Sequence, residues 1–580
     1  MKKNRIFKTI SGVALCTVLL TGCSESWLEP KPLSFLTPEN AYVDADGLLT
    51  SLAAAERSMR HEYFGNGSGY TCELIFSDLC ISGTTDKAGP LQDMDRQLMP
   101  DANFNNAENS YLTSHNWDEN WNQIKYTNVV LSRMKDTKFV NEAEKNKVLG
   151  TGYFQRCYRY WRLINQFGDV PFIDVEVTYP RYDFNTCDRW SILRRMKKEL
   201  ELYLHIPFCV RKCAYCDFLS FPAEKEIQKQ YVNCLIEEIR QFDLAEDYVV
   251  STIFFGGGTP SVLEGSEIMR IMQAIRERFP DIREDAEITI ECNPGTLTEE
   301  KLQIYQKAGI NRLSLGLQSA DQEELKLLGR IHTYNQFKEN FYLARRIGFA
   351  NINVDLMSAL PGQSVESYRC TLKKVCELGP EHISAYSLII EDGTPFAKRY
   401  RQDAAKREAG EKPQFLPSED EERQMYEDTA EILSEYGYHR YEISNYAKAG
   451  YVCRHNVGYW KRVDYIGFGL GASTLQNPLR YKNTDDLQEY LNRDFSKKEL
   501  LVLTKDNQIE ETLFLGLRMM EGVSLSAFEE HFHCPLTVIY QREIQKLTEK
   551  GLLRMEEDRI SLTEKGIDLS NMVLSEFLLG

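Results

Sequence analysis

The stretch LYLHIPFCVRKCAYC, residues 202–216, decides how this chain is interpreted. It joins a strand-like apolar run to three cysteines with the spacing C-x3-C-x2-C, namely Cys209, Cys213 and Cys216. Four-cysteine zinc sites usually use paired C-x2-C knuckles, which this trio does not provide. Three thiolates in one short loop can instead hold three irons of a [4Fe–4S] cluster and leave the fourth iron open. The alternative is a chance group of cysteines.

A repeated strand–loop–helix pattern surrounds this loop. Strands are expected at 202–206, 251–255, 286–291, 311–317, 351–356 and 382–388. Amphipathic helices lie between them, for example at 227–242, 268–279, 299–308 and 337–347. Such alternation predicts a parallel sheet with right-handed crossovers. Six units predict an α/β fold, an incomplete (β/α)6 barrel, whose site lies at the C-terminal ends of the strands.

Glycine and polar motifs fall at these strand ends. Three glycines, 256–258, with Thr259 and Pro260 follow the second strand, Glu291 ends the third, Gln318 follows the fourth and Asp355 ends the fifth. Successive glycines permit positive φ and let the backbone approach a ligand closely. Carboxylates can accept hydrogen bonds from ammonium groups, and Arg330 can pair with a carboxylate. Each residue alone would be interpreted as structural, but together they favour a binding site.

The cysteine spacing resembles that of the radical S-adenosylmethionine (SAM) superfamily, in which the open iron binds the amino and carboxylate groups of SAM. The motifs YLHIPFC at 203–209, FFGGGTP at 254–260, LSLGLQS at 313–319 and LPGQ at 360–363 resemble the oxygen-independent coproporphyrinogen III oxidase family. This resemblance runs from about Met196 to the end. It implies that the three cysteines ligate the cluster. It also implies a SAM site made of Tyr203, Tyr215, Gly257, Gly258, Thr259, Glu291, Gln318, Arg330 and Asp355.

Two features separate the branches of that family. The true oxidase has another cysteine two residues after the trio, where this chain has Phe218. The segment HNVGYW, 455–460, resembles the HNxxYW motif of the HemW branch of haem chaperones. That branch implies bound haem, with His455 as a possible axial ligand, whereas the plain alternative is a structural histidine. The competing function is the radical SAM oxidase, which would remove hydrogen and CO2 from a porphyrinogen propionate.

The first 195 residues have a different character. Residues 1–23 combine a basic start, an apolar core too short to span a bilayer, and Leu20-Thr21-Gly22-Cys23, which resembles a lipobox. The helical, aromatic-rich stretch 143–171, with Trp27-Leu28-Glu29-Pro30 and Thr37-Pro38-Glu39-Asn40, resembles RagB/SusD-like outer-membrane lipoproteins. The resemblance covers only the N-terminal part of such a protein and implies glycan binding as a further alternative.

The composition agrees with two parts joined near Met196. The chain has 580 residues and a net charge of −17, which argues against a general phosphate-backbone binder. Residues 1–195 contain 22 Lys and Arg against 24 Asp and Glu, so the remainder of the 69 and 86 gives 47 against 62. We therefore interpret the chain as a truncated SusD-like segment, 24–195, joined to a radical SAM protein.

The second part divides further by its sequence pattern. We expect a barrel core at 196–400, an α/β region with the HNxxYW motif at 401–506, and a winged-helix-like domain at 507–580. Acidic residues 556–558 at the expected wing oppose contact with nucleic acid. The expected partners are haem, haem-accepting proteins, an electron donor of flavodoxin or ferredoxin type, and a second copy in a homodimer. An oxygen-sensitive cluster predicts a cytoplasmic location, whereas the lipobox predicts export.

Overall fold

The computed structural model describes residues 42–63, 107–180, 184–189, 192, 197–243, 245 and 248–579. The expected signal segment with Cys23 and the motifs at 27–30 and 37–40 lie outside these residues. The chain divides into two compact units, Met1–Met196 and Lys197–Gly580. Among the described residues, no helix is both long enough and apolar enough to cross a membrane.

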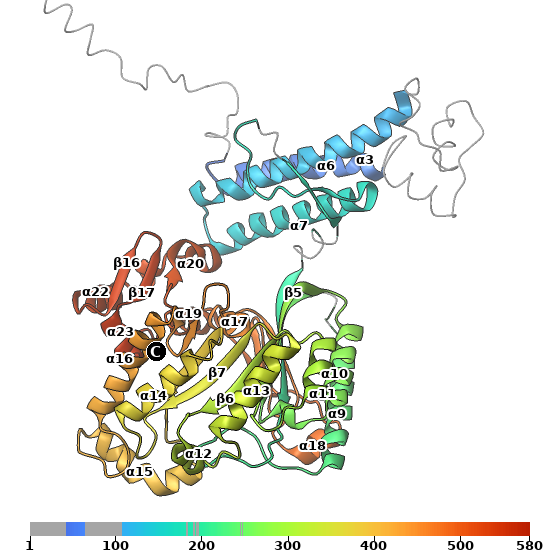
Figure 1. The fold of residues 1–580 in the computed structure, drawn as a ribbon. Coiled ribbons are helices and arrows are strands. Elements are labelled where there is room, and N and C mark those ends of the chain that lie inside the picture. Colours follow the sequence, from blue (N-terminus) through green and yellow to red (C-terminus); the bar gives the residue numbers. More distant parts are fainter. Residues whose placement is uncertain are drawn as a thin grey trace, which may run out of the picture. The chain divides into compact units, whose positions relative to one another are not determined.

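The first unit is built on three helices that lie side by side (Figure 1): α3 (Ala45–Tyr63), α6 (Ala107–Arg133) and α7 (Glu142–Phe167). A short 3-10 turn, η4 (Met134–Asp136), follows α6, and the two-residue strands β1 (Val170–Pro171) and β2 (Thr186–Cys187) pair with each other. Asn141 caps α7 by accepting from the Glu144 backbone at 3.0 Å. On the outer face of α7, Phe154 and Trp161 are 63% and 45% exposed, so part of its aromatic stripe is surface and not core.

The second unit contains the predicted parallel strands. They are β3 (Lys198–Ile206), β4 (Tyr248–Gly257), β5 (Ile282–Cys292), β6 (Arg312–Gln318), β7 (Ile352–Ser358) and β8 (His382–Ser387). Each pairs in parallel with the next, which confirms the barrel order expected from the sequence. The connecting helices are α9 (Lys225–Arg240), α10 (Gly265–Arg278), α11 (Glu299–Lys307), α12 (Gln322–Leu328), α13 (Tyr334–Ile347) and α14 (Val365–Cys376), with the short turn η6 (Pro260–Val262).

Alternation along the strands divides the barrel into an outer and an inner face. On β3, Leu200, Leu202, Leu204 and Ile206 are fully buried and belong to the main apolar core, which includes residues of α9 and α10. Successive side chains of a strand point to opposite faces. The intervening residues of the six strands therefore point into the barrel, and most of them are polar: Glu201, Tyr203, His205, Thr252, Glu287, Glu291, Arg312, Ser314, Gln318, Asn353, Asp355, His382 and Ser384.

The sheet extends past both edges of the predicted barrel. Within the described residues, twelve strands form one sheet in the order β14-β13-β12-β11-β3-β4-β5-β6-β7-β8-β10-β9. Strand β11 (Tyr465–Phe468) is parallel to β3, although more than 250 residues separate them. The other added strands are antiparallel: β9 (His439–Glu442), β10 (Asn445–Ala447), β12 (Ser473–Gln476), β13 (Leu479–Lys482) and β14 (Lys498–Val502). Helices α15 (Pro395–Glu408), α16 (Glu419–Glu435), α17 (Arg454–Trp460) and α18 (Leu487–Leu491) complete this region.

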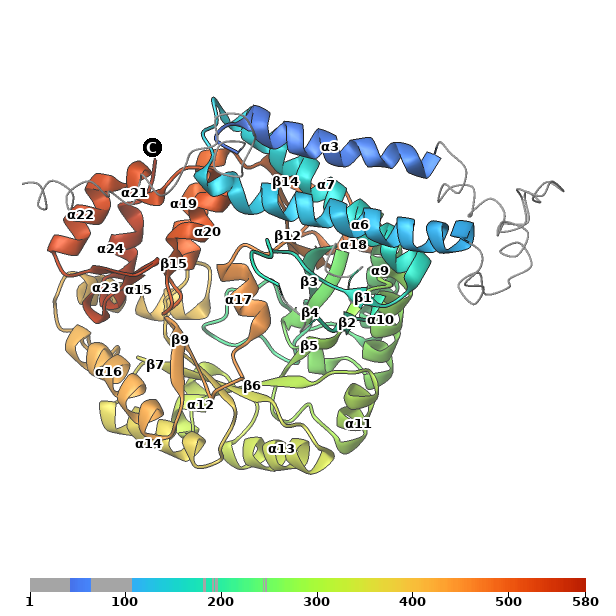
Figure 2. The ribbon, with the colours of Figure 1, turned by 90° about the horizontal axis from the view of Figure 1, so that it is seen from above.

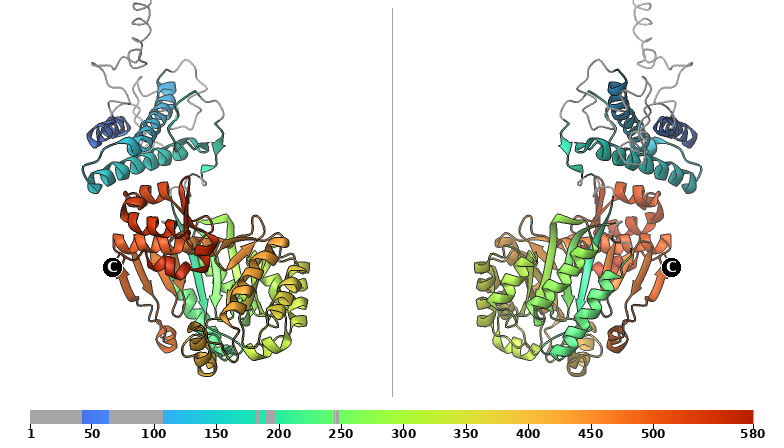
Figure 3. Two further views of the ribbon diagram at one scale, coloured as in Figure 1. Left: turned by 90° about the vertical axis from the view of Figure 1, so that its left-hand side faces the viewer. Right: turned by 90° about the vertical axis from the view of Figure 1, so that its right-hand side faces the viewer.

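A smaller helical cluster ends the chain, beside the barrel in both side views (Figure 3). It has its own apolar core around Leu513, Leu547 and Ile560. Strands β15 (Val523–Ser524), β16 (Leu553–Glu556) and β17 (Arg559–Leu562) form the predicted hairpin and one further strand. Its helices are α19 (Lys505–Gly516), α20 (Leu525–Phe532), α21 (Leu536–Ile539), α22 (Gln541–Glu549), α23 (Glu564–Asp568) and α24 (Ser570–Ser575).

Helix α17, which carries the HNxxYW segment, lies in the middle of the ring of strands when the second unit is seen from above (Figure 2). His455 is buried, and its ring stacks on Phe254 of β4 with centroids 4.9 Å apart. Gly458 lies against the carboxylate of Glu201, which is 2% exposed. The motif therefore closes one end of the barrel, and this close fit needs a glycine.

We predict that Gly458→Ala destabilises the second unit, because an added Cβ would overlap the Glu201 carboxylate. Overpacking of this kind costs roughly 1–3 kcal/mol of unfolding free energy. Urea unfolding of the full-length chain should show the loss in the transition of residues 197–580. Gly150→Ala in α7 is the control, since among the described residues no atom outside its chain neighbours and its own helix backbone lies within 4 Å of the added Cβ. An unchanged Gly458→Ala transition would contradict this packing.

Candidate functional site

The mouth of the barrel contains a cavity of about 310 Å³ at the C-terminal ends of the strands. Eleven of the residues predicted for the site line it: Cys209, Cys213, Tyr215, Cys216, Gly257, Gly258, Thr259, Glu291, Gln318, Arg330 and Asp355. These residues come from six separate segments of the chain. The cavity thus brings together residues that lie up to 146 positions apart in the sequence, from Cys209 to Asp355.

The three cysteines are half-buried free thiols in the loop after β3. Among the described residues, no three His, Cys, Asp or Glu side chains converge as ligands of one metal ion. A [4Fe–4S] cluster does not need such convergence, because each thiolate binds a different iron. Three free thiols facing one cavity therefore fit a cluster better than a single ion.

Backbone hydrogen bonds fix the cysteine loop to the glycine loop after β4. The amide of Gly258 donates to the carbonyl of Ile206, and that of Thr259 donates to the carbonyl of Phe208, both at 2.8 Å. A Cβ on Gly258 would lie 2.8 Å from the Phe208 carbonyl oxygen. The sequence suggested that these glycines admit a ligand, and the structure adds that they admit the cysteine loop itself.

Gly257 meets a second constraint in the same place. Its φ is +106°, and an added Cβ would lie 2.6 Å from the ring of His205. His205 Nε2 is 2.9 Å from the Leu219 carbonyl, so it must carry the proton and donate. His205 Nδ1 then accepts from the Tyr203 hydroxyl at 3.1 Å. Tyr203 is thus held beneath the cavity and does not line it, so its contact with SAM stays a prediction.

Two carboxyl groups and one guanidinium face the cavity. Burial, with the Asp355 charge as a second cause, raises the pKa of Glu291 to about 8. Burial also raises the pKa of Asp355, whose carboxylate accepts from Asn353 at 2.7 Å and Ser314 at 3.3 Å. Arg330 donates to Asn293 at 3.3 Å and to the Gly316 carbonyl, while its buried Nε has no partner within the described residues. The arrangement suits a ligand that carries both an ammonium and a carboxylate group.

Gln318 has strained backbone in the cavity wall. Its φ is +74°, which is uncommon for a residue with a side chain, and it lies at a bulge between β6 and β7. Its side-chain oxygen is buried and has no hydrogen-bond partner in the part of the chain that the structure describes. Strain and an unsatisfied buried oxygen together are typical of a ligand site.

His455 lies away from this cavity, in the closed end of the barrel. Its Nδ1 is 2.6 Å from the Thr252 hydroxyl and its Nε2 is 3.0 Å from the Tyr459 hydroxyl. Burial, and then the Arg312 charge, lower its pKa to about 3. Both ring nitrogens have protein partners, so ligation of haem iron by His455 stays a prediction that requires one of these bonds to break.

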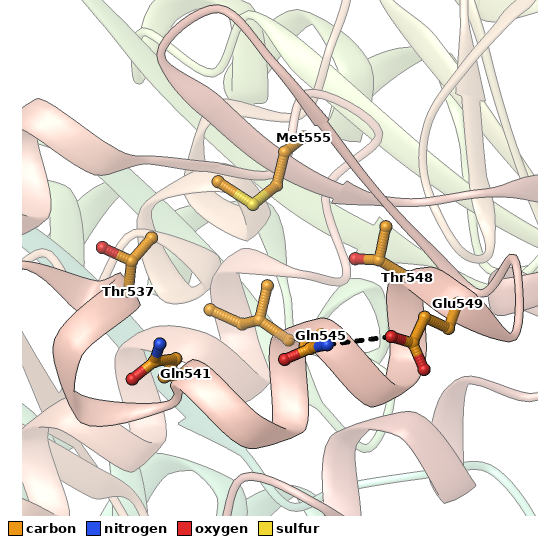
Figure 4. Close-up of a pocket in the computed structure, with 7 residues that line it drawn as sticks. Thr537, Gln541, Gln545, Thr548, Glu549 and Met555 are labelled. Atoms are coloured by element: carbon orange, nitrogen blue, oxygen red, sulfur yellow. Dashed lines mark hydrogen bonds between the residues drawn. The ribbon is translucent and has the colours of Figure 1, made fainter.

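Sequence reasoning missed several cavity residues, among them Asn293, Met357 and Tyr386. Tyr386 lies near the end of β8, a strand that the sequence predicted. It could therefore have been predicted from the rule that barrel sites lie at the C-terminal ends of the strands. Figure 4 shows another hollow, in the C-terminal cluster, lined by Thr537, Gln541, Ile544, Gln545, Thr548, Glu549 and Met555. It contains one carboxylate and no thiol, so the barrel mouth remains the candidate site.

Three family models match the chain. One described as the radical SAM superfamily matches residues 203–375, and one described as the HemN C-terminal domain matches 503–569. A third, described as starch-binding associating with outer membrane, matches 82–192. The matches divide between the two compact units.

Individual proteins are similar to about two thirds of the chain. The heme chaperone HemW of Lactococcus lactis is 38% identical over 386 residues, which are 66% of this chain and 98% of that protein. The HemW of Bacillus subtilis is 35% identical over 65% of this chain and 98% of its own length. Among solved structures, the coproporphyrinogen III oxidase HemN of Escherichia coli, a radical SAM enzyme, has a TM-score of 0.57. It is 26% identical and covers 66% of this chain and 91% of that one.

The raised pKa of Glu291 predicts a pH-dependent stability of the cofactor-free chain. A pKa raised by folding contributes stability that is full below the unfolded value, near 4.5, and is lost as the pH rises towards 8. In the wild type, this effect should lower the free energy of unfolding by an amount on the order of a few kcal/mol between pH 5 and pH 8. Glu291→Gln should remove that pH-dependent decrease, measured by urea unfolding. Glu284→Gln, at an exposed position of the same strand, is the control. Equal pH profiles for wild type and Glu291→Gln would show that this carboxyl is not held neutral.

Proposed function

The chain belongs to the HemW family of the radical SAM superfamily, and on that basis we propose that it is a haem chaperone. It binds haem and delivers it to haem-dependent proteins, with a SAM-bound [4Fe–4S] cluster in the barrel mouth. The observation that carries this proposal is the 38% identity with a HemW over 98% of that protein's length. Phe218, in place of a fourth cysteine, and the HNxxYW segment support the same branch.

The cavity fits the cofactors that this family implies. Cys209, Cys213 and Cys216 would hold the cluster, which supplies one open iron for SAM when bound. Glu291 and Asp355 would face the ammonium group of SAM, and Arg330 its carboxylate. The buried, unpartnered oxygen of Gln318 offers an acceptor in the same wall. These assignments use only groups that already face the cavity.

The partners follow from the same proposal. Haem and haem-accepting proteins are required, a flavodoxin- or ferredoxin-type protein would reduce the cluster, and a homodimer is a further expectation. An exposed open iron needs a reducing, low-oxygen compartment, which favours the cytoplasm for residues 196–580. Export of the fused chain, expected from the lipobox, would oppose this location.

We expect Cys213→Ala to abolish the visible charge-transfer absorbance of the anaerobically reconstituted full-length chain, because three thiolates are needed for the cluster. Iron and sulfide analysis should show a near-complete loss. Cys370→Ala is the matched control, since Cys370 is an exposed free cysteine on α14, outside the cavity. Full iron and sulfide in Cys213→Ala would refute the ligand assignment.

The chaperone and the oxidase make opposite predictions for the same sample. The reconstituted full-length chain should bind haemin and transfer it to an apo-haem protein, measured by the Soret absorbance of the acceptor. With SAM, reductant and coproporphyrinogen III it should form no protoporphyrinogen, because the oxidase cysteine is replaced by Phe218. Robust protoporphyrinogen formation would overturn the chaperone assignment in favour of the oxidase.

A further inference from the structure

Each sulfur of the cysteine trio has a polar neighbour from this chain. The Thr259 hydroxyl lies 3.4 Å from Cys209 Sγ, and Arg330 Nη1 donates to Cys213 Sγ at 3.6 Å. Ser220 Oγ lies 4.0 Å from Cys216 Sγ. These neighbours come from three different segments: the glycine loop, the segment after α12, and the cysteine loop itself.

The three contacts differ in what they can donate. Ser220 already donates its only hydroxyl proton to the Phe218 carbonyl at 3.2 Å, which leaves none for Cys216. Arg330 also donates to Asn293 and to the Gly316 carbonyl, so removing it would alter several contacts within the protein at once. The Thr259 hydroxyl, in contrast, has Cys209 as its one hydrogen-bond partner among the described residues.

Thr259 is held rigidly against this sulfur. Its amide donates to the Phe208 carbonyl, the residue just before Cys209, at 2.8 Å, and the residue is only 8% exposed. Once Cys209 loses its proton to bind iron, its sulfur can only accept, so the Thr259 hydroxyl must donate. Hydrogen bonds to cluster sulfurs are among the groups that set the reduction potential of an iron–sulfur cluster.

We propose that the Thr259 hydroxyl is a positioning group that donates to Cys209 and raises the reduction potential of the cluster. The inference rests on the cluster of the proposed function. Reduction adds negative charge to the cluster and its thiolates, so a fixed donor stabilises the reduced form more than the oxidised form. Thr259 thereby affects the reduction potential of the cluster, in addition to any contact that this residue makes with SAM.

The test is a redox titration of the anaerobically reconstituted full-length chain without SAM, followed by EPR of the reduced cluster. Thr259→Val keeps the branched shape and removes the donor. At the wild-type midpoint, its ratio of reduced to oxidised cluster should fall about threefold or more, where tenfold corresponds to 59 mV for one electron. Thr259→Ser should restore the wild-type ratio, because it keeps the hydroxyl.

Thr289→Val is the matched control for the chemical change. Thr289 is fully buried on β5, and its hydroxyl has no hydrogen-bond partner among the described residues, so its loss should leave the potential unchanged. If Thr259→Val holds less iron than wild type, Thr259→Ala provides the titration. If Thr259→Val and Thr259→Ala both lose the cluster while Thr259→Ser retains it fully, this result also supports the contact between the Thr259 hydroxyl and Cys209.

The outcomes separate this inference from the proposed function. A wild-type midpoint in Thr259→Val or Thr259→Ala, with full iron and sulfide, overturns the role of Thr259 while leaving the cluster in place. A wild-type chain that takes up no iron and sulfide overturns the cluster proposal itself, and this inference with it. A shift of equal size in Thr289→Val would also overturn it, because the effect would not depend on the sulfur contact.

Discussion

Alternation along the six parallel strands is the constraint on which the second unit depends. One face of each strand must be apolar because the helices pack on it, as the leucines of β3 show. The opposite face is thereby released from core packing and holds mainly polar residues. The inward polar side chains then form a ring that has a closed end and an open end. Polar groups at the closed end can find partners only within the protein, whereas those at the open end can also bind a ligand.

Helix α17 covers the closed end. It supplies Tyr459 to His455, and its first turn presents backbone amides to Glu287, which accepts from Arg454 and His455 at 3.1 and 3.3 Å. At the open end, the Gln318 oxygen and the Arg330 Nε have no hydrogen-bond partner among the described residues, and the same holds for Glu201 Oε2 and Arg312 Nε at the closed end. The same strands therefore build a closed layer packed against α17 and a receptive layer that lines the cavity. The backbone bonds of Gly258 and Thr259 then bring the thiols to the receptive layer.

Local patterns predicted most of this arrangement. The order of the six strands followed from apolar runs, and part of the site followed from motifs at strand ends. The full set of site residues, with Tyr215 and Arg330, came from the family resemblance. The sequence could not place α17 inside the barrel, because β11 pairs with β3 across more than 250 residues and no local pattern records such pairing. For the same reason, His455 was interpreted from its motif alone, without the Thr252 and Tyr459 hydroxyls that bond to its ring. The exposure of Phe154 and Trp161 could not be predicted either, because periodicity indicates one face of a helix without saying what covers it.

The position of α17 also gives the second unit an optical reporter. Of the six tryptophans in the chain, only Trp460 follows Met196, and it is the last residue of this helix. Its ring lies under the Arg518 guanidinium, 4.5 Å from the ring centroid, at the junction with the C-terminal cluster. Indole emission depends on the polarity and charge around the ring. In a polypeptide that starts after residue 196, the fluorescence emission of Trp460 would therefore report whether α17 is packed in the barrel.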